Sequence, residues 1–140
     1  MYILLRHCEK KSGSNPSLTE LGNNRAATLA RMFGENPDLS IFSTAYNRTR
    51  ETAAPLSQAT GQPIIEYDRH NISDFAATLA ATDGPKCVIG HSRSTLELLE
   101  KLTGIIGQPI NEDTEFDRLY MLRLPLTSAT ELLQMRYGPA

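Results

Sequence analysis

Four side chains in this sequence have the types and positions needed to bind and transfer a phosphoryl group. Arg6 and His7 end the apolar run "ILLRH", Arg48 follows "LSIFS" at the start of a predicted helix, and His91 ends "CVIGH". Neutral imidazole is present at pH 7 and can attack phosphorus directly. Arginine has a planar fork that suits phosphate oxygens, and a second histidine could hold these oxygens in the transition state. The combination predicts an anion site with a histidine nucleophile.

Each residue alone also has an ordinary explanation. A histidine at a strand end is more often structural than catalytic, and Arg48 on the first turn of a helix can be a solvated charge. Arg50 and Arg93 are by default surface residues, and His70 in "YDRHNIS" is expected to have no role. The recurrence of such residues at matching strand ends favours a shared site.

Alternating strands and helices would position these residues. Short apolar or alternating runs indicate strands, whereas apolar residues at helical spacing with capping signals indicate helices. The strands are predicted at residues 2–5, 39–43, 63–67, 86–91, 118–124 and 129–137. The helices are predicted from Ser17 or Thr19 to Gly34, from Arg48 to Thr60, from Asn71 or Ser73 to Ala80, and from Ser94 or Thr95 to Gly104. The first is expected to bury Leu21, Ala26, Leu29, Met32 and Phe33.

This pattern predicts an α/β fold of three layers. The central sheet is expected to be mostly parallel, with helices on both faces and a C-terminal antiparallel pair of strands. Ligands in such sheets bind outside the carboxyl ends of the strands. Arg6 with His7, residues 43–48, and Gly90 with His91 are therefore expected to meet at one edge.

Length and composition predict one domain over residues 1–140, because this is a usual size for a single core. The net charge of −2 gives no reason to expect nucleic acid or membrane binding. No apolar run approaches ~18 residues, and the chain begins as a core strand rather than a signal peptide. Cys8 and Cys87 lack a second ligand at zinc spacing, so buried thiols in a reducing cytoplasm are expected. A removed leader stays an open alternative.

Four segments of the sequence, in order, resemble the motifs of one known family. The first is "LLRHCEK", which resembles a strand followed by Arg-His-Gly, with Cys8 at the glycine position. Next comes "LTELGNNRA", similar to Leu-Thr-x-x-Gly-x-x-Gln-Ala, with Arg25 for Gln. The third is "STAYNRTRETA", similar to Ser-Ser-Pro-x-x-Arg-Ala-x-x-Thr-Ala, with Ala45 for Pro. The last is "VIGHSRST", similar to Val-x-Gly-His, with Arg93 where Asn is common. Together these segments resemble the histidine phosphatase superfamily, also called phosphoglycerate mutase-like. The tail "EFDRLYMLRL" resembles its small bacterial members.

The resemblance implies a metal-independent phosphatase that hydrolyses a phosphomonoester or phosphoramidate. His7 would be the nucleophile and form a phosphohistidine, while Arg6, Arg48 and His91 would complete the phosphate pocket. Ser92 could add a further donor. No metal or organic cofactor is implied. A chain this short lacks the insertions that cover the site in larger relatives, so the expected substrate is a phosphorylated small molecule or a phosphoprotein.

The general acid is the least defined part of this interpretation. Larger relatives carry a carboxylate, usually Glu, that protonates the leaving oxygen, and it would come from the segment after the third strand. The candidates are Glu66, Asp68 and Asp74 in that segment, and also Glu9 and Glu51. Without an acid, good leaving groups such as that of phosphohistidine would still react.

Three other functions stay open. "GHSRS" resembles the nucleophile elbow of serine hydrolases, with Ser92 as nucleophile, although no histidine follows His91 as that fold requires. The departures from the family motifs leave room for a non-catalytic phosphate-binding module. A mutase is the third alternative, but it needs an enclosed site. Cys8 either tolerates its turn or makes the site sensitive to oxidation.

Overall fold

A computed structural model describes residues 1–123 and 132–138, and all six strands of this part form one sheet. The sheet order is β3-β2-β4-β1-β5-β6, with β1 to β4 parallel and β5 and β6 antiparallel. The strand bounds are β1 (Tyr2–Arg6), β2 (Ser40–Ser43), β3 (Ile64–Glu66), β4 (Lys86–Gly90), β5 (Arg118–Leu122) and β6 (Leu132–Arg136). The predicted mostly parallel α/β sheet with a C-terminal antiparallel pair is confirmed. Parts of the last two predicted strands, residues 124 and 129–131, lie outside the described residues.

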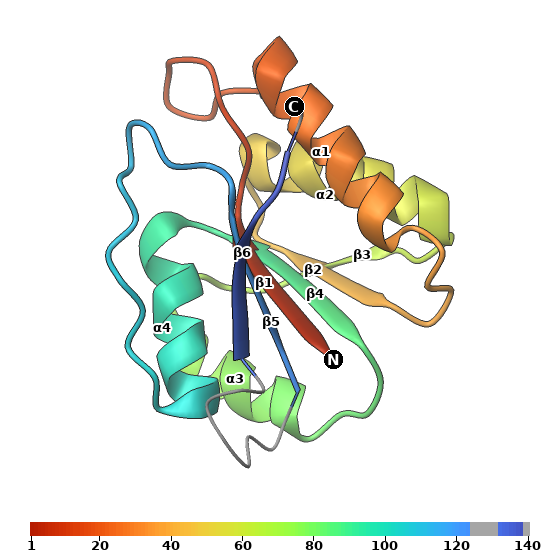
Figure 1. Ribbon diagram of the computed structural model, residues 1–140, viewed down its shortest axis with the longest axis vertical. Helices are drawn as coiled ribbons and strands as arrows, with labels where there is room; N and C mark the ends of the chain where they lie inside the picture. Colours follow the sequence, from red (N-terminus) through yellow and green to blue (C-terminus); the bar gives the residue numbers. More distant parts are fainter. Residues whose placement is uncertain (124–131, 139–140) are drawn as a thin grey trace.

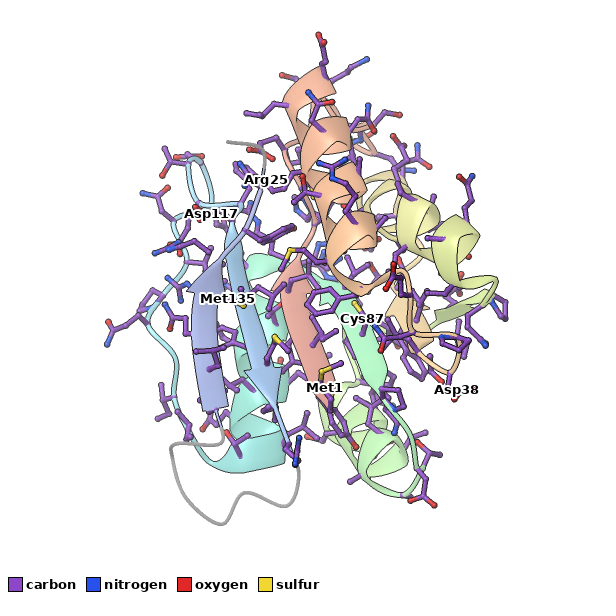
Figure 2. All side chains as sticks on the ribbon, turned by 45° about the vertical axis from the view of Figure 1, so that its right-hand side comes forward. Met1, Arg25, Asp38, Cys87, Asp117 and Met135 are labelled. Carbon is purple, nitrogen blue, oxygen red and sulfur yellow. The ribbon has the colours of Figure 1, made fainter. Side chains whose placement is uncertain are left out.

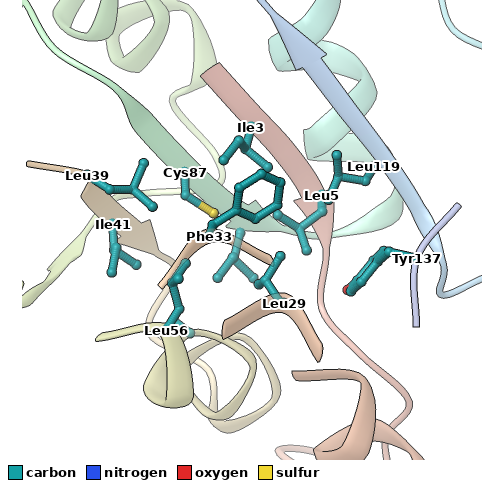
Figure 3. Close-up of a cluster of buried hydrophobic side chains, with 12 residues drawn as sticks. Ile3, Leu5, Leu29, Phe33, Leu39, Ile41, Leu56, Cys87, Leu119 and Tyr137 are labelled. Atoms are coloured by element: carbon teal, nitrogen blue, oxygen red, sulfur yellow. The ribbon is translucent and has the colours of Figure 1, made fainter. Parts of the chain in front are cut away.

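Two pairs of helices cover the two faces of the sheet and make three layers (Figure 1). The helices are α1 (Glu20–Phe33) and α2 (Asn47–Thr60) on one face, and α3 (Ile72–Ala80) and α4 (Ser92–Thr103) on the other. Side chains alternate along β1, so Ile3 and Leu5 pack in the α1–α2 cluster and Leu4 packs in the α3–α4 cluster. Figure 3 shows the first cluster, in which Phe33 lies close to Cys87. No helix of residues 1–123 and 132–138 is long and apolar enough to cross a membrane.

The two central strands, β1 and β4, hold the residues at their carboxyl ends in fixed positions. Every residue of β1 and β4 is buried, and the two strands pair in parallel from Tyr2 with Lys86 to Arg6 with Gly90. In Figure 2, Met1 marks the starting end of β1, and the strand runs upward from it, toward the level of Arg25 in α1. The carboxyl ends of β1 and β4 therefore stop at the same edge, at residues that the core holds in place.

Two details of the helices differ from the prediction. Leu21 and Met32 are 50% and 36% exposed, because the buried stripe of α1 is instead Gly22, Ala26, Leu29 and Phe33. The last helix begins at Ser92 rather than at Ser94 or Thr95. Ser94 is the third helical residue, and its hydroxyl accepts a hydrogen bond from the His91 N–H at 2.9 Å. His91 is therefore the N-cap residue of α4. Thr19, one of the two predicted caps, accepts from the Gly22 N–H at 3.1 Å.

Gly22 allows the start of α1 to approach the segment that follows His7. A Cβ atom at this position would overlap the Glu9 carbonyl oxygen. Gly22→Ala is therefore expected to lower the free energy of unfolding by roughly 1–3 kcal/mol, the usual cost of overpacking. Urea denaturation measures this effect. The control is Asn23→Ala at the exposed neighbouring position, where higher helix propensity favours a small gain. Equal or greater stability of Gly22→Ala would contradict the close approach.

Candidate active site

His7 and His91 meet because β1 and β4 are neighbours. The His7 N–H donates to the Gly90 carbonyl at 2.9 Å, which continues the ladder of hydrogen bonds beyond β1. The two imidazole rings have centroids 5.7 Å apart at an angle of 66°. Gly90 is required here, since a Cβ atom would approach Tyr67 Oη to 2.6 Å and Ser94 Oγ to 2.9 Å. Two histidines 84 positions apart in the sequence thus share one edge of the sheet.

The hydrogen bonds of His7 define its tautomer. His7 Nδ1 lies 2.7 Å from the Cys8 carbonyl oxygen, which can only accept, so Nδ1 carries the proton. The lone pair is then on Nε2. Burial, with the charges of Arg6 and Arg48 as smaller causes, lowers the pKa of His7 to about 3. His7 is therefore neutral at pH 7 and has the electron pair that a nucleophile needs.

Arg6 has one half of its guanidinium bonded to the protein and the other half free to bind a ligand. Its Nη1 donates to the carbonyls of Glu115 at 2.8 Å and Asn111 at 3.4 Å, and its Nη2 donates to the Glu112 carbonyl at 2.7 Å. The Phe116 ring lies 4.2 Å from Arg6 Cζ. Three of the five N–H groups are used, which leaves Nε–H and one Nη2–H as a fork for two oxygens.

Arg48 lies in the first turn of α2 and faces His91. Its Nη2 is 3.5 Å from His91 Nδ1, and its Cζ lies 4.6 Å from the Tyr46 ring. The buried side-chain nitrogens without a hydrogen-bond partner in the described residues are Arg6 Nε and Arg48 Nε. An unpaired buried donor costs about 1–3 kcal/mol. Two such donors beside two neutral histidines indicate a site preorganised for an oxyanion.

A chain of hydroxyl groups orients His91. Thr49 Oγ1 donates to the carbonyls of Thr44 and Tyr46, both at 3.0 Å. Its single proton is thereby used, so Thr44 donates to Thr49 Oγ1 at 2.8 Å and accepts from His91 Nε2–H at 2.9 Å. His91 Nδ1 then has the lone pair, and it faces Arg48 Nη2. Burial, followed by the charges of Arg69 and Arg48, lowers the pKa of His91 to about 3.

These residues line a cavity of about 250 Å³ with an excess of positive charge. The basic side chains around it are Arg6, Lys10, Arg48, Arg69 and Arg93, and the acidic ones are Glu112 and Asp113. The structure therefore brings together His7, Arg6, Arg48, His91 and Ser92, the five residues predicted to form the site. Arg93 lies at the exposed rim rather than on an unrelated surface.

Four charged lining residues were missed from the sequence. Arg69 follows the carboxyl end of β3, so the rule that located His7 and His91 applies to it. Glu112 and Asp113 precede β5, whose antiparallel direction brings its starting end to the same edge. The fourth, Lys10, follows His7 by three positions.

A larger cavity, of about 540 Å³, surrounds Lys86 at the opposite end of β4. There the Lys86 ammonium already donates to two backbone carbonyls.

None of the five predicted general acids lines the cavity. Glu9 pairs with Arg25 at 2.8 Å, Glu51 accepts from the Leu18 N–H, Glu66 pairs with Arg50, Asp68 accepts from the His70 N–H, and Asp74 accepts from Asn71 Nδ2. Each therefore has a structural partner elsewhere. The segment after β3 contributes a cation instead, through Arg69.

Ser92 is not arranged as a hydrolase nucleophile. It is the first residue of α4, and its hydroxyl donates to Glu112 Oε1 at 2.7 Å. The neighbouring His91 bonds through Nε2 to Thr44 rather than to Ser92. The serine hydrolase alternative therefore lacks the histidine that would activate the hydroxyl.

Cys8 and Cys87 are buried free thiols, as predicted. No non-glycine residue in the described ranges has a positive φ, so the turn at Cys8 does not require the glycine of the family motif. Burial raises the pKa of Cys8 to about 11, and its Sγ lies 3.4 Å from Tyr137 Oη. Because the thiolate is the reactive form, this environment argues against sensitivity to oxidation. Ala45, the replacement for Pro, is exposed and lies in the turn before α2.

Comparisons with known proteins agree with the fold and with the family that the sequence resembles. The model of the histidine phosphatase superfamily (branch 1) matches residues 2–71, which is half of the chain. The protein therefore belongs to the histidine phosphatase superfamily. No curated protein matched the sequence.

Within residues 1–123 and 132–138, no group of three or more His, Cys, Asp or Glu residues is placed to hold a metal ion.

Several solved structures share the fold at low sequence identity. The putative phosphohistidine phosphatase SixA from Agrobacterium tumefaciens is 20% identical, with a TM-score of 0.67 over 99% of this chain and 97% of its own. A protein histidine phosphatase SixA in complex with tungstate is 15% identical, with a TM-score of 0.66 over 96% of each chain. A mycobacterial glucosyl-3-phosphoglycerate phosphatase is 16% identical, with a TM-score of 0.67 over 85% of this chain and 87% of its own.

The two neutral histidines are expected to make stability depend on pH. In the unfolded chain they titrate near 6.5, whereas burial lowers both native pKa values to about 3. The unfolded chain therefore binds more protons between these values, so stability is lost as pH falls below 6.5. Each histidine accounts for up to about 2 kcal/mol by about pH 5. Urea denaturation of His7→Gln should show a shallower decline with falling pH. An unchanged slope would contradict the lowered pKa, and His70→Gln is the control.

Proposed function

We propose that this protein is a phosphatase that transfers the phosphoryl group of its substrate to His7 and then to water. The observation that carries the proposal is the pair of buried, unpaired guanidinium nitrogens, Arg6 Nε and Arg48 Nε, beside a neutral His7. Membership of the histidine phosphatase superfamily supports it, as does the fold shared with named phosphatases. The proposal extends to one domain over residues 1–140 and to a cytoplasmic location.

In the first step, His7 Nε2 attacks phosphorus, the P–N bond forms, and the bond from phosphorus to the leaving group breaks. Arg6 and Arg48 bind the equatorial oxygens as the charge on them is redistributed. A bound dianion raises the pKa of His91, whose Nδ1–H can then donate to a phosphoryl oxygen while Nε2–H stays on Thr44. In the second step, water attacks phosphorus, the P–N bond breaks, and its electron pair returns to His7.

The substrate is a phosphorylated small molecule or a phosphoprotein with a good leaving group. The carboxylates predicted as general acids lie outside the cavity, so protonation of the leaving group receives little help. Phosphoramidates, whose leaving nitrogen is readily protonated, are favoured over alkyl esters. One of the similar structures is a protein histidine phosphatase SixA, and another is named a putative phosphohistidine phosphatase. A third is named a glucosyl-3-phosphoglycerate phosphatase, so the comparisons support both substrate classes.

A substrate series tests this proposal. The rates for phosphohistidine, an aryl phosphate, a sugar phosphate and a phosphoserine peptide are compared at equal concentration. The expected order places phosphohistidine and the aryl phosphate first. Phosphate binding without turnover of any of the four would favour the non-catalytic binding module. Transfer of the phosphoryl group to an acceptor alcohol in preference to water would favour the mutase.

A further inference from the structure

Glu112 has a position that neither the sequence nor the family motifs assign to a function. It lines the phosphate cavity, and its Oε1 accepts the hydrogen bond from Ser92 Oγ at 2.7 Å. Ser92 follows His91 directly, so this bond attaches the carboxylate to the edge of the sheet where the two histidines meet. Asp113, the other carboxylate of this cavity in the described ranges, instead bonds Asn111 Oδ1 through its backbone N–H at 3.0 Å.

The backbone of Glu112 is held by the same arginine that offers its fork to the phosphate. Arg6 Nη2 donates to the Glu112 carbonyl at 2.7 Å, and Nη1 donates to the Glu115 carbonyl at 2.8 Å. The turn also closes on itself, because the Glu115 N–H donates to the Asn111 carbonyl at 2.9 Å. Both the main chain and the carboxylate of Glu112 are therefore positioned relative to His7 before any substrate binds.

The charges around Glu112 keep its carboxylate ionised. The hydrogen bond from Ser92 lowers its pKa below the ordinary value of 4.5, and the guanidinium groups of Arg6, Arg93 and Arg69 act in the same direction. The remaining ionisable groups of the cavity are the guanidinium of Arg48, the ammonium of Lys10, the carboxylate of Asp113, and the two histidines. Glu112 is thus ionised at neutral pH and can accept a proton, but has none to give to a leaving group.

We propose that Glu112 is the general base for the second step of the reaction and that Ser92 is its positioning residue. The inference rests on the proposed use of His7 as nucleophile. The oxygen of water attacks the phosphorus of phosphorylated His7, the P–Nε2 bond breaks, and its electron pair returns to Nε2. The proton of the water goes to the Glu112 carboxylate, which afterwards releases it to solvent. General base catalysis of this kind contributes about 10²–10⁴-fold.

This assignment separates the two steps of the reaction. Formation of phosphorylated His7 depends on the quality of the leaving group, because no carboxylic acid assists it. Hydrolysis depends on Glu112. Loss of the base should therefore leave phosphorylation fast for an activated substrate and make hydrolysis limiting, so that the phosphorylated protein accumulates.

Rapid mixing of Glu112→Gln with dinitrophenyl phosphate tests the inference. The amide keeps the size of the side chain and its acceptor for Ser92, but it cannot take a proton. The expected result is a burst of dinitrophenol close to one equivalent, followed by steady-state release at least ~10²-fold slower than in the wild type. The fraction of protein phosphorylated on His7, measured after an alkaline quench, should rise. Ser92→Ala should shift both values in the same direction by a smaller factor.

Asp113→Asn is the charge-matched control, since it removes one negative charge from the same cavity without breaking the bond to Ser92. Its phosphorylated fraction is expected not to rise. A rise in both variants would assign the effect to cavity charge and would overturn the role of Glu112, as would an unchanged phosphorylated fraction in Glu112→Gln. Absence of phosphorylated His7 in the wild type as well would instead overturn the proposed function.

Discussion

His7→Ala is expected to lower kcat by at least ~10³-fold, since it removes the atom that forms the covalent bond to phosphorus. The side chain is 2% exposed and neutral, with Nδ1–H on the Cys8 carbonyl and its lone pair on Nε2. Alanine leaves the arginine forks in place, so phosphate should still bind. The measurement is steady-state turnover of an aryl phosphate together with phosphate affinity.

The control for this variant is His70→Ala, an exposed histidine outside the phosphate cavity. Its turnover is expected to stay within about 2-fold of the wild type, as is usual for an exposed surface position. Circular dichroism verifies that His7→Ala is folded. Near-native turnover of a folded His7→Ala protein would refute the proposed nucleophile.

Arg48→Ala is expected to lower kcat/KM by about 10²-fold or more, the scale for loss of one charged donor in the transition state. Its free energy of unfolding should stay equal or increase, because the buried Nε has no partner in the folded protein. Loss of activity without loss of stability identifies a group preorganised for a ligand. Turnover and urea denaturation of the same preparation measure the two effects.

Two variants define what Arg48 contributes. Arg48→Lys keeps the positive charge but loses the planar fork, so it should recover only part of the activity. Arg50→Ala, two positions further along α2, removes an exposed guanidinium that pairs with Glu66 and should change turnover by less than about 2-fold. Full activity of Arg48→Ala would remove the central argument from the unpaired nitrogens.

Much of the fold was predictable because its signals are local. The buried strands before His7 and His91 are short apolar runs, and their parallel pairing follows from the helices between them. The meeting of His7, Arg48 and His91 at one edge then follows from topology alone. The stripe of α1 was misjudged at Leu21 and Met32, because Gly22 rather than a large residue faces the Glu9 backbone.

The carboxylate of the site was not predictable in the same way. Glu112 lies in an irregular segment before β5, and its place depends on the tertiary hydrogen bonds of Arg6 and Ser92. No periodicity or capping signal marks such a segment. The hydrogen bonds that join Thr49, Thr44 and His91 could not be predicted from the sequence either, although Thr44 lies within the third motif. Arg69, in contrast, could have been predicted as a site residue, since it follows the end of β3.

Trapping the phosphorylated protein tests the central claim most directly. The wild type is mixed with a phosphate-labelled aryl phosphate, quenched in alkali to preserve phosphoramidates, and digested for peptide mapping. The label is expected on the peptide that contains His7, at the Nε2 position, because Nδ1–H is bonded to the Cys8 carbonyl. Turnover without label on His7 under these conditions, or label on Ser92 instead, would contradict the proposed mechanism.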